Sequence, residues 1–257
     1  MASLVQASTG TCVKVASPWA AAGRYRGGQT WPQGCEDQFM TTQNLLDRLA
    51  HLSTTSLVDA SPTLRILPHS LRPTVAGCHL VGRVVTARAN RDLMSVIHAL
   101  RESGPGDALV VDAGGDDRAV AGELFGTEAQ RRGLAGLVIL GRSRDSATLA
   151  GLAMPVWSTG VAPNAYAANS LPETGVTLSL NGVRVDPGEL IVGDDDGLVV
   201  GSEEEFGAAV DKAEAVEARE KGLLAQLLDG ISLFDVTNYD EHLAALRDGR
   251  PGGLAFG

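Results

Sequence analysis

The stretch GDALVVDAGGDDRAVAGELFGTEAQRRGLAGLVIL, residues 106–140, decides the fold. Its two apolar runs, at 106–115 and 134–140, are short and continuous, which is typical of strands buried on both faces of a sheet. The segment between them, 118–133, has helical spacing and ends at a glycine. The order strand, helix, strand predicts two parallel strands joined by a right-handed crossover.

The flanking sequence continues this alternation on both sides. Apolar spacing predicts helices at 42–51, 53–60 and 92–103, and strands at 77–89 and 154–163. The turn signals NG and DPGE within 175–202 indicate antiparallel strands, and the charged amphipathic segment 203–230 predicts a long C-terminal helix. We therefore expect an α/β fold, a single α/β/α domain with a central mixed sheet over residues 40–236, followed by a tail at 237–257.

Residues 1–39 differ from the rest of the chain. They are rich in Gly, Ser, Thr and Ala, and they show no sustained hydrophobic period. The segment lacks the apolar core of a secretory signal. It contains few acidic residues, so a transit peptide stays an alternative interpretation. We expect a disordered extension.

Bulk composition narrows the partners that the protein can have. The chain has 257 residues and a net charge of −10, so a broad basic face for nucleic acid is not expected. No window approaches the roughly 18 apolar residues of a membrane span. The three cysteines, Cys12, Cys35 and Cys78, form no CxxC pair, which favours unpaired thiols and a cytoplasmic protein.

Two loops follow the central strands, at 112–117 and 141–145. Because ligands bind at the carboxyl ends of parallel strands, these loops should share one crevice. Arg144 offers a planar fork to a carboxylate or a keto oxygen, and Asp145 is a hard oxygen ligand for Mg²⁺ or Mn²⁺. Glu123 could hold metal-bound waters, and backbone amides of residues 122–125 could cradle a carboxylate.

Each of these features also has a structural interpretation. An Arg-Asp dipeptide in a loop is usually a solvated ion pair, and Gly114-Gly115 alone is usually a turn. The stretch GDDDG, 193–197, lacks the spacing of a calcium loop and reads as a strand-connecting turn. No GxGxxG or GxSxG motif supports a dinucleotide site or a serine hydrolase.

Taken together, the motifs GDALVVDAGGDDRAVAGELF, RGLAGLVILGRSRD, PVWSTGVAP, VRVDPGELIVGDDDGLVV and EAREKGLLAQLLDG resemble the RraA-like family over about residues 45–233. That family includes class II 4-hydroxy-4-methyl-2-oxoglutarate/4-carboxy-4-hydroxy-2-oxoadipate aldolases and the regulator of ribonuclease E activity A. Its aldolase motif, an acid followed after twenty positions by Arg-Asp, fits Glu123 and Arg144-Asp145.

The resemblance implies a role for each of these residues. Asp145 would ligate Mg²⁺ or Mn²⁺ directly, and Glu123 would hold the ion through water. Arg144 would bind the pyruvyl part of a small 2-oxo acid and stabilise its enolate. Amides near Gly122, Leu124 and Phe125 would bind the substrate carboxylate. It also implies a homotrimer or homohexamer with the site at a subunit boundary.

The sequence departs from the family pattern at two positions. Thr148 stands where an acid often follows the Arg-Asp pair, and Leu140 stands where an Asp is common. The intact Arg144-Asp145 pair favours an enzyme, a metal-dependent lyase that cleaves 4-hydroxy-2-oxo acids to pyruvate or decarboxylates oxaloacetate. The alternative is a non-catalytic ring protein that regulates a ribonuclease or another partner.

Overall fold

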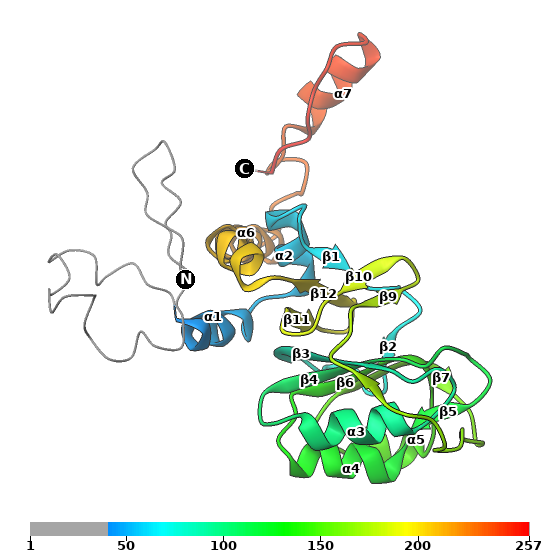
Figure 1. The fold of residues 1–257 in the computed structure, drawn as a ribbon. Helices are drawn as coiled ribbons and strands as arrows, with labels where there is room; N and C mark the ends of the chain where they lie inside the picture. The colour runs from blue at the N-terminus through cyan, green and yellow to red at the C-terminus, as the bar shows by residue number, and fades with distance from the viewer. Residues whose placement is uncertain (1–40, 257) are drawn as a thin grey trace, which may run out of the picture.

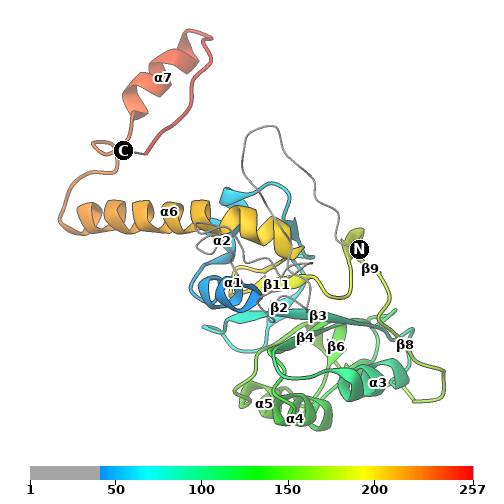
Figure 2. The ribbon, with the colours of Figure 1, turned by 60° about the vertical axis from the view of Figure 1, so that its left-hand side comes forward.

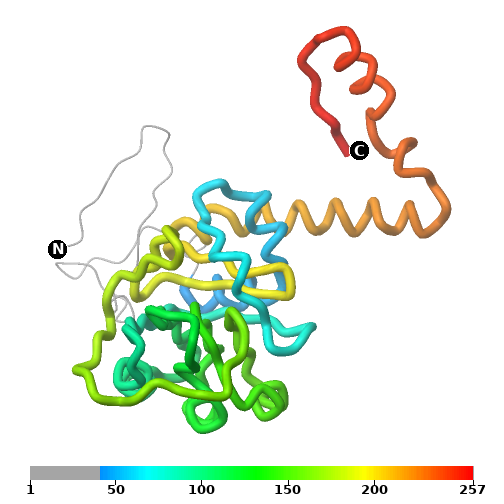
Figure 3. Tube along the Cα trace, turned by 90° about the vertical axis from the view of Figure 1, so that its right-hand side faces the viewer, coloured from blue at the N-terminus to red at the C-terminus, as the bar shows by residue number. Residues whose placement is uncertain are grey.

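The computed structural model describes residues 41–256, and Figures 1–3 show their arrangement. The extension predicted at 1–39 lies outside the described residues. The helices are α1 Thr42–Leu49, α2 Thr54–Ala60, α3 Met94–Glu102, α4 Glu123–Arg131, α5 Ser146–Ala150, α6 Glu203–Leu228 and α7 Tyr239–Arg247. The strands are β1 Arg65–Ile66, β2 Arg72–Pro73, β3 Leu80–Arg88, β4 Asp107–Asp112, β5 Ala119–Ala121, β6 Gly136–Ser143, β7 Val156–Val161, β8 Glu173–Thr174, β9 Leu178–Leu180, β10 Val183–Val185, β11 Leu190–Gly193 and β12 Leu198–Gly201.

A central mixed sheet organises the domain. Its strand order is β1-β12-β11-β3-β4-β6-β7-β2, with β3, β4, β6 and β7 parallel and β11 and β12 antiparallel. The run Ala108–Val111 of β4 is fully buried, because both of its faces are covered. The predicted α/β class, the mixed sheet and the parallel β4–β6 pair are confirmed.

The sheet curls until its two edges approach each other. Seven spacings separate β1 from β2 in the strand order, which would be about 34 Å in a flat sheet. The chain joins these edges through residues 67–71 alone, a link that reaches about 22 Å at most. The curl therefore brings the two halves of the sheet face to face over one core, in which Trp157 of β7 packs with Ile191 of β11.

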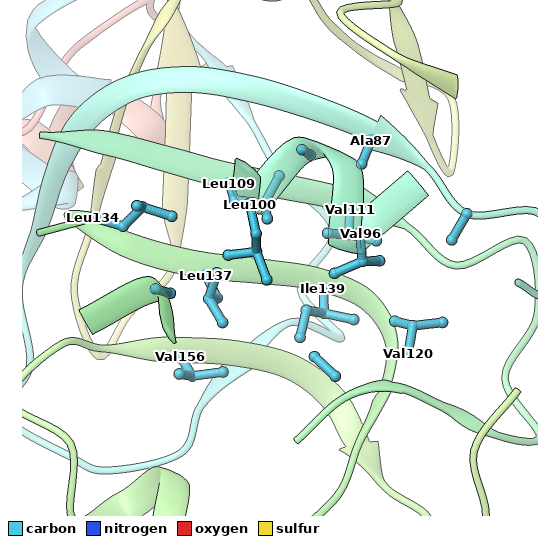
Figure 4. Close-up of a cluster of buried hydrophobic side chains, with 14 of the residues drawn as sticks. Ala87, Val96, Leu100, Leu109, Val111, Val120, Leu134, Leu137, Ile139 and Val156 are labelled. Carbon is cyan, nitrogen blue, oxygen red and sulfur yellow. The ribbon is translucent and has the colours of Figure 1, made fainter. Parts of the chain in front are cut away.

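Helices cover the outer faces of this curled sheet (Figure 1). Figure 4 shows Val96 and Leu100 of α3 over Leu109, Leu137 and Ile139 of the parallel strands. On the other half of the sheet, residues of α1, α2 and α6 pack on β11 and β12 around the fully buried Phe206. The predicted flanking helices are confirmed.

One predicted element is wrong in its first part. The segment 118–133 is not helical throughout, because β5 occupies 119–121 before α4 begins at Glu123. The buried Ala-Val-Ala run pairs in parallel with β6, and Gly122 follows it in an extended conformation. The break matters for the site, because it places a helix N-terminus directly at the sheet edge.

The predicted long C-terminal helix is present as α6. A capping box begins it, in which the Ser202 side chain and the Glu205 side chain each accept a backbone N–H of the other residue. Figures 2 and 3 show that its distal half projects away from the domain and leads to α7, which lies within the predicted tail. Among the described residues, no helix is both long and apolar enough to cross a membrane.

Candidate active site

The segments predicted as loops lie side by side at the carboxyl edge of the parallel strands, but only Arg144 and Asp145 of 141–145 are loop, because β6 continues to Ser143. Residues 112–117 do not line the pocket described below. β4 and β6 are direct neighbours, so the loops that follow them share this edge. The Glu123 N–H donates to Asp145 Oδ2 at 3.0 Å, which joins the start of α4 to the end of β6. The structure thus brings Gly122, Glu123, Arg144 and Asp145 together, although they come from separate segments.

Asp145 has an unusual backbone conformation. Its φ of 57° lies in the left-handed region, which aspartate tolerates better than most residues. Its main-chain carbonyl accepts N–H groups from the first turn of α5, but its side chain does not cap that helix. The carboxylate therefore turns back toward Gly122 and Glu123.

Gly122 allows this close approach. A Cβ at this position would lie 2.5 Å from Asp145 Oδ2 and 2.7 Å from Arg144 Cγ. Any side chain here would displace both groups, because real Cβ atoms essentially never come within 3.0 Å of another atom. The glycine is required by the packing of the Arg-Asp pair and not by a left-handed backbone.

A small open pocket of about 40 Å³ lies beside these residues. Its lining is formed by residues 119–125, Arg144, Leu93 and Ala165. Within residues 41–256, the N–H groups of Leu124 and Phe125 have no acceptor, as expected for the first turn of a helix. Two free amides and the positive end of α4 therefore face a space that suits a carboxylate.

Arg144 contributes the positive charge of the pocket. Its backbone N–H donates to Ala121 O at 2.9 Å, and its Nε lies 3.5 Å from Asp145 Oδ2. The side chain is 41% exposed, so much of the guanidinium remains available to a ligand. The Glu123 carboxylate is exposed and has no partner among residues 41–256.

The donor set fits a hard divalent ion bound mainly by water. Asp145 supplies one carboxylate, whose Oδ1 accepts no hydrogen bond from the described part of the chain. Within that part, no group of three or more His, Cys, Asp or Glu residues gathers to hold a metal. Mg²⁺ binds in this way, since it keeps several waters and needs only one or two carboxylates.

Gly114 and Gly115 form a turn after β4, as their structural interpretation predicts. Gly114 has a φ of 69° and packs against Asn90, and a Cβ on Gly115 would meet Arg91 Nε and Tyr166 Oη, each at 2.7 Å. These glycines accommodate the protein's own side chains. Sequence reasoning missed Arg91 and Tyr166, because only the folded chain brings them to this turn.

The GDDDG stretch is a turn between β11 and β12, as predicted. Asp194 accepts hydrogen bonds from the N–H and hydroxyl of Thr54, each at 2.7 Å, and from the N–H of Asp196 at 3.0 Å. Its carboxylate anchors the start of α2 to the turn. The stretch is thus explained by structure and forms no part of the site.

Comparisons with known proteins show the family and the fold. A sequence model of the family described as "RraA-like: Aldolase/RraA" matches residues 54–200. A Halalkalibacterium halodurans protein named "Putative 4-hydroxy-4-methyl-2-oxoglutarate aldolase" is 35% identical over 178 residues, which cover 67% of this chain and 85% of that protein.

Two solved structures are also similar. The RNA-processing inhibitor RraA of a Thermus species is 33% identical, with a TM-score of 0.55, over 58% of this chain and 91% of that chain. A Streptomyces coelicolor protein, described as an unusual member of the RNase ES inhibitor RraA protein family, is 31% identical, with a TM-score of 0.61, over 69% of this chain and 93% of that one.

Proposed function

The chain belongs to the RraA-like family, and on that basis we propose that it is a divalent-metal-dependent lyase. Its reactions are the cleavage of 4-hydroxy-2-oxo acids to pyruvate and the decarboxylation of oxaloacetate. The observation that carries the proposal is a pocket lined by Arg144 and the free amides of α4, with Asp145 held next to both by its contacts with Glu123 N–H and Arg144. The name of the Halalkalibacterium relative supports the aldolase part.

The protein groups divide the chemistry between them. The N–H groups of Leu124 and Phe125 bind the substrate carboxylate at the N-terminus of α4. The Arg144 guanidinium lies where negative charge develops on the keto oxygen and stabilises the enolate. Asp145 would hold Mg²⁺ or Mn²⁺, and the ion would supply Lewis-acid stabilisation of the same charge.

Glu123 is proposed as the base for aldol cleavage. Its carboxylate is exposed at the start of α4 and has no partner among residues 41–256, so it is free to take the proton of the C4 hydroxyl. Oxaloacetate decarboxylation forms the same enolate but has no hydroxyl proton to remove. Glu123→Gln should therefore lower aldol cleavage while leaving decarboxylation largely intact.

We also propose that a second copy of the chain covers the site. The pocket is small and open, and the apolar side chains of Leu124 and Val161 at this edge are 74% and 60% exposed. A homotrimer or homohexamer with the site at a subunit boundary would bury them. The mass of the native protein by light scattering tests this arrangement.

The decisive experiment measures pyruvate release from oxaloacetate and from 4-hydroxy-2-oxoglutarate, coupled to lactate dehydrogenase. Activity should disappear with EDTA and return with Mg²⁺ or Mn²⁺. Asp145→Ala should abolish it, and Arg144→Ala should lose about 2–4 kcal/mol of transition-state stabilisation, the scale of one oxyanion donor. Turnover like that of the wild type in either variant would contradict the assignment.

A second candidate is a regulator without chemistry. It is favoured by the two solved relatives described as RNA-processing and ribonuclease inhibitors, and by the exposed Thr148 in place of an acid. The same assay separates the candidates. The absence of metal-dependent product from every 2-oxo acid tested would favour the regulator.

A further inference from the structure

An arginine occupies a strained turn beside the pocket. The turn Ala89–Asp92 is closed by the Asp92 N–H donating to Ala89 O at 2.9 Å, and its central residues, Asn90 and Arg91, have φ values of 49° and 63°. Glycine normally fills the second of these positions, because a residue with a Cβ is strained in the left-handed region. A charged residue held against such strain points to a role for its side chain.

The Arg91 side chain is held over the glycine turn that follows β4. Its Nε donates to Gly114 O at 3.2 Å, and the space that a Cβ on Gly115 would fill is shared by Arg91 and the Tyr166 hydroxyl. Tyr166 donates a hydrogen bond to Asp117. That hydrogen bond keeps the pKa of Asp117 below its usual range, and the Arg91 charge acts in the same direction.

This cluster adjoins the pocket described above. Leu93 and Ala165 of the pocket lining are close chain neighbours of Arg91 and Tyr166. Arg91 follows β3 and Arg144 follows β6, with β4 between them, and β6 runs three residues past Leu140, which is level with the end of β3. Two strand spacings across the sheet and this stagger along it place the starts of the two segments about 14 Å apart. That spacing suits a short dicarboxylate gripped by one long side chain at each end.

The terminal nitrogens of Arg91 remain available to a ligand. Among residues 41–256, the only hydrogen bond of its side chain is the one from Nε to Gly114 O, and the guanidinium forms no ion pair within 4 Å. Arg118 differs, because its Nε lies 3.9 Å from the Asp117 carboxylate. A guanidinium that is anchored through Nε and open at its two terminal nitrogens presents a fork that matches a carboxylate.

We propose that Arg91 is a specificity-determining residue that binds the distal carboxylate of a dicarboxylic 2-oxo acid, whose keto-acid end lies at Arg144. The inference rests on the proposed lyase function and assigns to it the group that distinguishes dicarboxylic from monocarboxylic substrates. Gly115 and Tyr166 act as positioning residues, because they shape the space that holds the guanidinium.

A matched pair of substrates tests the inference. 4-Hydroxy-2-oxoglutarate carries the distal carboxylate, and 4-hydroxy-2-oxopentanoate has a methyl group in its place. Arg91→Gln should lower kcat/KM for the first at least tenfold, mainly through KM, and leave the second within twofold. Arg118→Gln is the control and should change neither value, and Arg91→Lys should retain part of the discrimination.

Arg91→Gly separates this role from a structural one. Removing the side chain relieves the left-handed strain, so the melting temperature should stay equal or rise while discrimination between the two substrates is lost. A clear drop in melting temperature with equal losses on both substrates would overturn the inference. Unchanged kinetics on the dicarboxylate would overturn it as well.

Calorimetry with 2-oxoglutarate and 2-oxobutyrate distinguishes this failure from failure of the lyase proposal. Suppose that the protein has no lyase activity but binds 2-oxoglutarate more tightly than 2-oxobutyrate, and that Arg91→Gln binds the two equally. The lyase proposal then fails and the role of Arg91 stands. If the protein is an active lyase whose preference is the same in Arg91→Gln, the role of Arg91 fails and the lyase proposal stands.

Discussion

Gly122→Ala is expected to disable the site although it replaces no side chain that takes part in the proposed chemistry. The new Cβ would lie 2.5 Å from Asp145 Oδ2 and 2.7 Å from Arg144 Cγ. To reach an ordinary contact of 3.4 Å, these atoms must move by about 0.9 Å and 0.7 Å. Both belong to the residues proposed to hold the metal and the enolate.

The magnitude follows from the hydrogen bond that such a shift breaks. The Glu123 N–H donates to the Asp145 carboxylate at 3.0 Å, and a bond to a charged acceptor contributes roughly 1.5–3 kcal/mol. Loss of a group that orients a metal ligand typically lowers metal affinity 10–100-fold, which agrees with this energy. We expect losses of about this size in Mn²⁺ affinity and in kcat/KM.

Two measurements check the prediction independently. Free Mn²⁺ counted by electron paramagnetic resonance gives the affinity without any turnover, and pyruvate release gives the activity. Gly207→Ala is the control, because no atom lies within 4 Å of its added Cβ and alanine favours the helix α6. Wild-type affinity and turnover in Gly122→Ala would refute the argument from close approach.

Three further predictions concern stability. Hydrogen bonds from the Asn169 N–H and other backbone amides lower the pKa of Asp92, so its stabilisation is present at neutral pH and lost as the pH falls through its folded value. Asp92→Asn should therefore lower the free energy of unfolding at pH 7. Measured by urea titration, the difference in unfolding free energy between the variant and the wild type should become smaller near pH 3. Asp194→Ala should cost about 1–3 kcal/mol by thermal unfolding, whereas Asp196→Ala, exposed on the same turn, should cost nothing measurable. Phe206→Ala, which empties a fully buried position, should cost about 3–5 kcal/mol by denaturant unfolding.

The sequence predicts the parallel core well, because its signal is local. The runs at 106–115 and 134–140 are continuous and apolar, and such runs are stable only when both faces of the strand are covered. β5 was not predicted, because its sequence carries no local signal for a strand. Three small apolar residues fit a helix or a strand equally well, and only their pairing with β6 decides between the two.

The curl of the sheet has no local signature at all. It follows from the short link at 67–71, which joins β1 at one edge of the sheet to β2 at the other edge. β1 pairs with β12, and β2 pairs with β7. The pairing partners of β1 and β2 are far away in the sequence. No pattern of apolar spacing within the segment itself could reveal them.

The candidate site also contains residues that the sequence predicts and residues that only the folded structure reveals. The spacing of Glu123 from Arg144-Asp145 matches the motif of the family and predicts these residues. In the fold they meet at one sheet edge, where Glu123 begins α4 and Arg144-Asp145 link β6 to α5. Arg91 and Tyr166 stay hidden in the sequence. Their place beside Gly115 depends on a left-handed turn after β3 and on a loop after β7, and both are consequences of tertiary packing.

The pairing of β1 with β12 also governs how the chain is made. Arg65 lies opposite Val200, so β1, the first strand of the described residues, finds its neighbour only after β12, the last of them, has been synthesised. Contacts of such long range slow folding, and the nascent chain carries an open sheet edge until β12 has left the ribosome. A truncated product that stops before β11 would lack both strands that close this edge, and it would be a substrate for proteolysis rather than a folded fragment.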